Sequence, residues 1–195
     1  RLLDSAGDEA ARLEVVRVLP VTQRKHEIEL VQAIPRQGRM EMILQKATEL
    51  GACSIQPVIT EHTVVRLDEK KRAKKIKRWQ KVVVNAAKQC NLAALPQLKP
   101  VCTLGEYLER QGSGATLLLC SLSAEALSLK QALIDRENAD NAAIKVLVGP
   151  EGDFSEAEHA AALAAGAVPV SLGDRVLRTD TAAFYILAAL DYALS

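Results

Sequence analysis

Apolar positions along the chain alternate between two spacings, and this alternation divides it into predicted strands and helices. Short apolar runs of strand length are followed by segments in which apolar residues recur every three or four positions. The predicted strands are 13–19, 27–34, 54–59, 115–120, 144–148 and 168–172. The predicted helices are 39–50, 69–89, 104–110, 127–135, 155–165 and 181–194, and the acidic segment 4–10 is predicted to be loop.

This order of elements predicts an α/β fold. Strands separated by helices require parallel crossovers and a sheet that is covered on both faces. Two of the helices carry further local signals. Ser155 and Glu158 have the spacing of a capping box, and Trp79 lies in the apolar stripe of 69–89, so we expect it in the core.

Composition narrows the functional classes. The chain has 195 residues, of which 49% are hydrophobic, 25% are charged and 3% are aromatic, with a net charge of +1. None of the four cysteines forms a C-x-x-C pair, and the three histidines share no ligand spacing, so we expect reduced thiols and no metal. The most apolar stretch, 182–190, is too short to span a bilayer. We therefore expect a cytoplasmic protein.

Two glycine-bearing turns each follow a predicted strand. Gly149-Pro150-Glu151-Gly152 ends the strand 144–148, and Gly173 ends the strand 168–172. Open α/β sheets bind ligands at the carboxyl edge, where such turns expose backbone N–H and C=O groups. The first turn lacks both the G-x-G-x-x-G spacing and the phosphate-loop lysine, which disfavours ordinary nucleotide binding. A tight turn without a ligand is the alternative interpretation.

Arg175 and Arg178 lie in the loop that leads into the last helix. The next three residues, 179–181, offer an N-cap, which explains their polarity but not the two arginines. We favour a loop that wraps a ligand, with an arginine facing a phosphate or a base.

Positive charge is concentrated between Arg66 and Lys88, where ten Lys or Arg accompany two acids. Such a basic face indicates binding to a phosphate backbone, and a plain solvated helix face is the alternative. The candidate RNA-binding residues are Arg36, Arg39, Lys46, Arg66, Lys71, Lys74, Lys75, Arg78 and Arg175.

Taken together, these motifs resemble those of the bacterial ribosomal small-subunit RNA uridine-N3 methyltransferases, a family of the SPOUT class. The resemblance runs from about Ile28 to the C-terminus. It rests on 149–152 and 172–182, on 39–40 and 45–51, and less specifically on 79–81 and 86–90.

The resemblance implies a SPOUT-type parallel sheet over 28–195, with a deep trefoil knot near the C-terminus that binds S-adenosylmethionine. Residues 1–27 would then be the remnant of a β-rich, PUA-like RNA-binding module. The cofactor contacts implied by the family are Leu118, Leu119, Gly149, Pro150, Glu151, Gly152, Leu172, Gly173, Val176, Leu177, Thr179, Thr181 and Ala182.

The resemblance also implies a homodimer that methylates N3 of a specific uridine in 16S ribosomal RNA. Negative charge develops on the base as its N3 proton leaves, and Arg178 is the candidate catalytic group that would stabilise it. No residue stands out as general base, and water or Glu151 could serve. Two other functions stay open: a non-enzymatic RNA-binding assembly factor, and a SPOUT methyltransferase that acts on transfer RNA.

Three positions depart from the family pattern. Asn91-Leu92 stand where the family commonly has Gly-Arg, Asp153 stands for a frequent glycine, and Asp174 for a frequent proline. We therefore do not extend the resemblance to fine substrate specificity.

Overall fold

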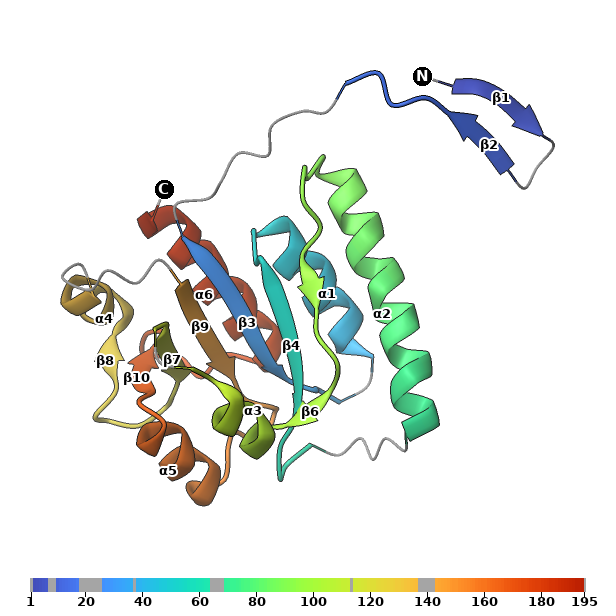
Figure 1. Ribbon diagram of the computed structural model, residues 1–195. Helices are drawn as coiled ribbons and strands as arrows, with labels where there is room; N and C mark the ends of the chain where they lie inside the picture. The colour runs from blue at the N-terminus through green and yellow to red at the C-terminus, as the bar shows by residue number, and fades with distance from the viewer. Residues whose placement is uncertain are drawn as a thin grey trace.

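The computed structural model describes residues 2–6, 10–17, 26–36, 38–63, 69–112, 114–136 and 143–194. Its main sheet has the strand order β5-β4-β3-β9-β7-β10-β8, with β6 beside β4, and all its pairings are parallel (Figure 1). The strands are β3 Glu27–Ala33, β4 Ser54–Ile59, β5 Gln97–Leu98, β6 Cys102–Thr103, β7 Thr116–Cys120, β8 Leu127–Ser128, β9 Ala143–Val148 and β10 Val168–Ser171. The helices are α1 Arg39–Glu49, α2 Glu69–Gln89, α3 Leu104–Arg110, α4 Leu129–Arg136, α5 Glu156–Ala164 and α6 Thr179–Leu194.

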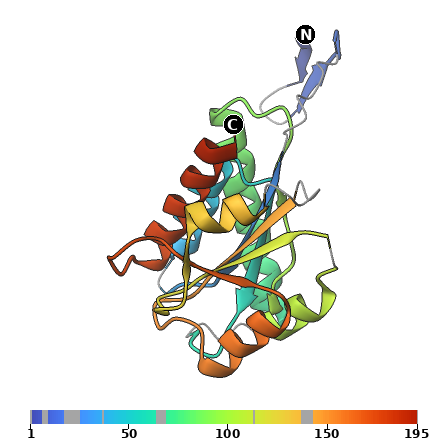
Figure 2. The same cartoon turned by 90° about the vertical axis from the view of Figure 1, so that its left-hand side faces the viewer.

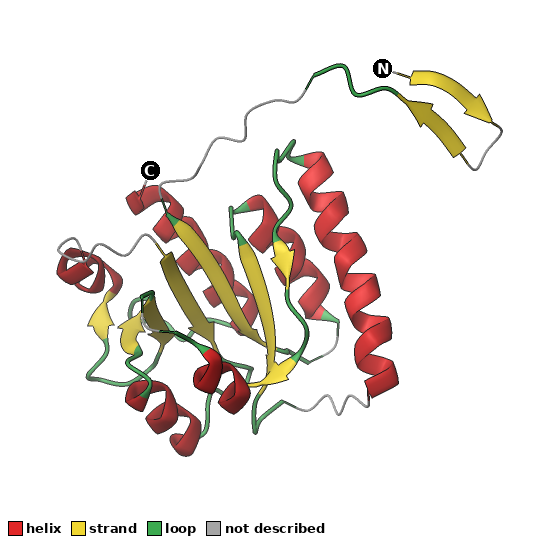
Figure 3. Cartoon of the chain, viewed as in Figure 1, coloured by secondary structure: helices red, strands yellow, loops and turns green. Residues whose placement is uncertain are grey.

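The sheet lies between two helical layers, as the side view in Figure 2 and the colouring by secondary structure in Figure 3 show. Helices α1, α2, α4 and α6 pack on one face, where Leu30, Ile43 and Ile186 belong to a common hydrophobic cluster. Helices α3 and α5 cover the other face, where Val31 and Leu147 pack with Phe154. Strands buried on both faces need nearly continuous apolar sequences, which is why β3 and β9 could be recognised.

The predicted α/β class with a parallel sheet is confirmed. The capping box of α5 is also confirmed, because the Ser155 hydroxyl accepts from the Glu158 N–H and the Glu158 carboxylate accepts from the Ser155 N–H. Trp79 is buried, with 3% of its surface exposed, as its place in the apolar stripe predicted.

The N-terminal predictions were wrong in two places. The segment 4–10 was expected to be loop, but β1 (Leu2–Ala6) occupies part of it and pairs antiparallel with β2 (Ala10–Leu13). The strand expected over 13–19 does not extend into 14–17, although Val15 and Val16 have high strand propensity. Both side chains are exposed there, and a β-branched run forms a strand only where it has a pairing partner and a buried face.

Two of the departures from the family pattern have a backbone explanation. Asn91 and Asp153 have φ values of 54° and 59°, in the left-handed region that glycine adopts most easily. Asn and Asp tolerate this region better than other residues with a side chain. Each substitution therefore keeps the backbone conformation that a glycine would have allowed.

Candidate functional site

A cavity of about 270 Å³ lies at the carboxyl ends of three adjacent strands, β7, β9 and β10. We call it the strand-end cavity. The chain that leaves each of these strands contributes to its wall. Its lining residues are Cys120, Ser121, Leu122, Val148, Gly149, Pro150, Glu151, Asp153, Leu172, Gly173, Arg175, Val176, Leu177, Arg178, Thr179 and Ala182.

The turn that follows β9, residues 149–153, is closely packed, and we call it the β9 turn. A Cβ built on Gly149 would lie 2.9 Å from Oδ1 of Asp153 and 3.3 Å from the Phe154 ring. Asp153 Oδ1 accepts a hydrogen bond from the Phe154 N–H at 2.8 Å. A side chain at position 149 would therefore push the turn apart.

The loop after β10 has a different requirement for glycine. Gly173 has a φ of +105°, a conformation that side chains rarely adopt, and a Cβ there would meet no atom within 4 Å. Because Gly173 lines the strand-end cavity, a large side chain at this position has open space into which it could extend.

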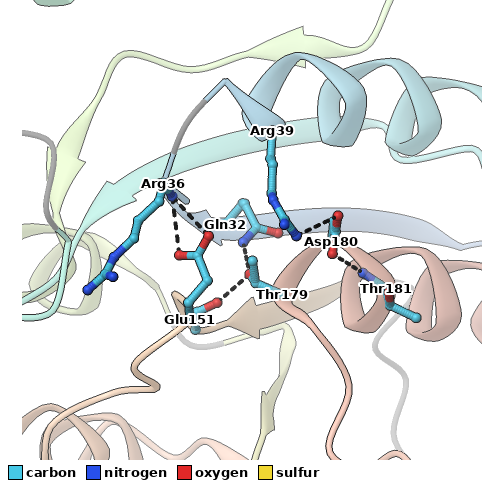
Figure 4. Close-up of polar contacts among 8 residues, drawn as sticks. Gln32, Arg36, Arg39, Glu151, Thr179, Asp180 and Thr181 are labelled. Carbon is cyan, nitrogen blue, oxygen red and sulfur yellow. Dashed lines mark hydrogen bonds and ion pairs between the residues drawn. The ribbon is translucent and has the colours of Figure 1, made fainter.

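A buried hydrogen-bond chain joins the two cavity segments to β3 (Figure 4). Gln32, at the end of β3, has no exposed surface, and its Nε2 donates to the Ala33 carbonyl at 2.9 Å and to Thr179 Oγ1 at 3.0 Å. The Thr179 hydroxyl in turn donates to the Gly149 carbonyl. The start of α6 is thus joined to the β9 turn and to β3 through Thr179.

Two contacts from the segment after β3 reinforce this arrangement (Figure 4). The Arg36 backbone N–H donates to both carboxylate oxygens of Glu151, at 3.0 and 3.2 Å. The Arg39 guanidinium forms an ion pair with Asp180 at 3.2 Å, in the first turn of α6. Both oxygens of Glu151 are therefore engaged, and a role as general base would require it to give up this contact.

Most of the predicted cofactor residues lie together in the cavity wall. These are Gly149, Pro150, Glu151, Leu172, Gly173, Val176, Leu177, Thr179 and Ala182, and the candidate Arg178 lies beside them. Gly152 faces the other side of the β9 turn, and Thr181 is an exposed residue of α6 outside the lining.

Leu118 and Leu119 are not among the residues that line the strand-end cavity. Both are fully buried, and because side chains alternate along a strand they enter the hydrophobic clusters on opposite faces of the sheet. The wall at the end of β7 consists instead of Cys120, Ser121 and Leu122. The signal that could have identified them is the end of the strand, since the lining begins where β7 stops.

Two lining residues that the sequence analysis did not identify, Cys120 and Ser121, have distinctive chemistry. Burial raises the pKa of the Cys120 thiol to about 12, and the nearby Asp153 carboxylate adds to the effect. Ser121 Oγ lies 3.1 Å from Nε2 of His159 on α5 and accepts from the Ser123 N–H at 3.1 Å. The Cys120 thiol is therefore uncharged at neutral pH.

Several of the predicted RNA-binding side chains make contacts within the chain. Lys46 pairs with Glu49 at 2.6 Å, and Arg78 pairs with Glu41 at 2.6 Å. Lys75 lies 5.7 Å from the centre of the Trp79 ring, within the range of a cation–π contact. Arg36, Lys74 and Arg175 are exposed, Arg39 is paired as described above, Arg66 lies outside the described residues, and Lys71 is described only by its backbone in α2.

Among the described residues, no group of three or more His, Cys, Asp or Glu has an arrangement that could hold a metal ion. No helix in the described part of the chain is both long enough and apolar enough to cross a membrane.

The sequence matches a family model described as an RNA methyltransferase domain over residues 22–191. Ribosomal RNA small subunit methyltransferase E of Synechocystis is 34% identical to this chain, over 100% of the chain and 62% of that protein. The enzyme of the same name from Bacillus subtilis is 32% identical, over 90% of the chain and 68% of that protein. The chain thus spans less than two thirds of the Synechocystis protein's length.

Solved structures give a consistent result. Ribosomal RNA small subunit methyltransferase E from Neisseria gonorrhoeae, bound to S-adenosyl methionine, has a TM-score of 0.78 and 36% identity, covering 88% of this chain and 70% of that chain. A methyltransferase from Legionella pneumophila in complex with the same cofactor has a TM-score of 0.78 and 34% identity, covering 87% of this chain and 67% of that chain. The chain belongs to the RNA methyltransferase domain family, among the relatives of ribosomal RNA small subunit methyltransferase E.

Proposed function

We propose that this chain transfers a methyl group from S-adenosylmethionine to ribosomal RNA of the small subunit, in the cytoplasm, and that the acceptor is N3 of a uridine. The observation that carries the proposal is the strand-end cavity, which is built from the two glycine turns of the family and lies at the carboxyl edge of a parallel sheet. Relatives with the same fold and more than 30% identity have been solved with this cofactor bound.

The lining suits the cofactor chemically. The wall consists of the β9 turn and the loop after β10, together with the apolar side chains of Leu172, Val176 and Leu177. Backbone groups can hydrogen-bond an adenine edge and a ribose, while the apolar side chains exclude water. For Leu118, Leu119, Gly152 and Thr181, a cofactor contact stays a prediction that rests on the family resemblance.

S-adenosylmethionine would supply a methyl group on a positively charged sulfur. The chain's own task is to orient an acceptor nitrogen in line with that group and to stabilise the charge that develops on the base. Arg178 is exposed, lines the cavity and immediately precedes α6. We propose that its guanidinium faces the uracil oxygens, and that the exposed face of α2, with Arg36 and Arg175, binds the RNA phosphates.

Three finer features belong to the same proposal. The segments that follow β7, β9 and β10 all line the same cavity, and this supports a trefoil knot around it. Val176, Tyr185 and Tyr192 are exposed large side chains in the last loop and helix, and they support a homodimer contact. The antiparallel pair β1–β2 is consistent with residues 1–27 being the end of a PUA-like RNA-binding module.

A calorimetric titration with S-adenosylmethionine tests the proposal first. The wild-type chain should bind with a stoichiometry near one per subunit, and Gly173→Arg should lose binding because its side chain enters the cavity. No saturable binding by a folded wild-type chain would overturn the methyltransferase function and favour a non-enzymatic RNA-binding factor.

A methyl-transfer assay tests the substrate and the role of Arg178. Small-subunit ribosomal RNA and transfer RNA would each be incubated with labelled cofactor, digested and analysed for 3-methyluridine. We expect label in the ribosomal RNA, and label confined to transfer RNA would overturn the proposed substrate.

Arg178→Ala should lower turnover at least tenfold while changing cofactor affinity little, and unchanged turnover would exclude Arg178 from the mechanism.

A further inference from the structure

The β9 turn is a thin partition between two hollows. Glu151 and Asp153 line the strand-end cavity on its inner side. Gly152 lies between them in sequence but lines a second hollow of about 380 Å³, together with Arg36, Glu61, His62 and Thr63. Contacts from the outer side can therefore support the turn in addition to those from Thr179 and Arg36.

His62, from the segment after β4, makes that support. Its Nδ1 lies 2.9 Å from the backbone carbonyl oxygen of Asp153. A Cβ built on Gly152 would lie 3.2 Å from Cβ of His62, so the histidine packs directly against the turn where the glycine permits it. Two neighbouring residues of the turn are therefore in contact with one imidazole.

The hydrogen bond fixes the state of the ring. A carbonyl oxygen only accepts hydrogen bonds, so Nδ1 must carry the proton and donate it. The same bond raises the pKa of His62 above its ordinary value, because the carbonyl stabilises the charged ring. The neutral ring can keep its proton on Nδ1 and then makes the same hydrogen bond. The bond can therefore form in both the charged and the neutral state of His62.

The carbonyl that accepts the hydrogen bond from His62 belongs to Asp153, whose backbone conformation is unfavourable for a residue with a side chain. Asp153 has a φ of +59° without being glycine. Its side chain is already bonded to the Phe154 N–H, so the left-handed conformation is held from one side by that bond and from the other by His62.

The segment that carries His62 is itself anchored to the same region. The Glu61 N–H donates to Glu158 Oε1 at 2.9 Å, in the first turn of the helix that follows the β9 turn. Inside the segment, the Thr60 N–H donates to Thr63 Oγ1 at 3.0 Å. His62 is therefore presented to the turn by a backbone that is fixed on both sides of it.

We propose that His62 is a positioning residue, which braces the β9 turn from outside and so keeps the cofactor wall in its binding conformation. This inference rests on the proposed function, because it assumes that the strand-end cavity holds S-adenosylmethionine. His62 contacts neither the cavity nor the reacting atoms and acts only through the turn.

Two substitutions separate bracing from a charge contact with RNA. His62→Ala removes the donor, whereas His62→Asn keeps an N–H donor at nearly the position of Nδ1 but cannot carry a charge. Glu61→Gln is the matched control, because its backbone bond to Glu158 stays. The dissociation constants for S-adenosylmethionine and for a small-subunit ribosomal RNA transcript would be measured for each variant of the chain after a check of its fold by circular dichroism.

We expect His62→Ala to weaken cofactor binding by about three- to tenfold, the usual effect of one lost hydrogen bond, with RNA affinity unchanged. His62→Asn should recover cofactor binding to within about twofold, and Glu61→Gln should match the wild type. Unchanged cofactor binding in His62→Ala would overturn this inference but leave the proposed function standing. So would a loss of RNA affinity that His62→Asn fails to restore. A wild-type chain that binds no cofactor would overturn the proposed function and this inference together.

Discussion

Individual residues at the cavity are constrained by backbone geometry more than by charge. Gly149 allows a close approach of Asp153 and Phe154, and Gly173 provides a positive φ where no other atom is near. Gln32 is constrained by burial and by hydrogen bonds. It is fully buried, its Nε2 makes two hydrogen bonds, and its Oε1 has no hydrogen-bond partner within the described structure. The site thus depends on residues whose side chains are small or hidden.

Gly173→Ala should lower both stability and cofactor affinity. An alanine at a φ of +105° is strained, at a cost of about 1–2 kcal/mol in the free energy of unfolding. Gly166→Ala is the matched control, because Gly166 has a φ of +85° and open space around it but lies outside the cavity lining. Urea unfolding should show a lower free energy of unfolding in both variants. Calorimetry should show weaker cofactor binding only in Gly173→Ala. Equal cofactor binding by the two variants would contradict the cavity assignment.

Cys120 should react slowly with iodoacetamide near neutral pH, because the thiolate is the reactive form and a thiol with a pKa of about 12 is almost fully protonated there. Its alkylation rate should rise about tenfold for each pH unit up to pH 10 without reaching a plateau. Peptide mass mapping identifies the site, and added S-adenosylmethionine should slow the reaction further. An alkylation rate that levels off by pH 10 would show that the pKa is not raised.

At the scale of elements, the buried parallel strands and the amphipathic helices could be predicted, because their apolar spacing follows from burial alone. The exceptions depended on pairing. Val15 and Val16 have a strand-like sequence but no partner strand in the described structure, whereas β8 is a two-residue strand only because β10 lies beside it. The end of β7 at Cys120 was predicted, but the place of Cys120 and the two residues after it in the cavity wall was not, because it depends on the pairing of β7 with β10.

Helix α2 should bind RNA through its exposed basic face. Lys74 and Lys81 are exposed on α2, while Trp79 and Val83 on the same helix are buried. The double substitution Lys74→Gln/Lys81→Gln should weaken RNA binding and reduce the slope of log K against log salt by about 1.4–1.8 if each lysine contacts one phosphate. Lys130→Gln, an exposed lysine of α4, is the control. An unchanged salt slope would mean that this face is merely solvated.

At the scale of the whole molecule, the cavity joins segments from distant parts of the sequence, so ligand binding should stabilise the entire domain. At a cofactor concentration of one hundred times the dissociation constant, the gain is about 2.7 kcal/mol. For a chain of this size the melting temperature should rise by about 5–10 °C. Differential scanning fluorimetry measures the shift, and Gly173→Arg should show none. A wild-type melting temperature that ignores saturating cofactor would contradict binding to the native state.

The contacts around the β9 turn also determine when the site can exist during synthesis. Thr179 bonds Gln32 across 147 residues, Glu151 bonds Arg36 across 115, and Asp153 bonds His62 across 91. Early segments therefore wait for partners that the ribosome adds 91 to 147 residues later. The strand-end cavity therefore cannot form until Thr179 has been added, because a shorter chain lacks the start of α6 and the bond to Gln32.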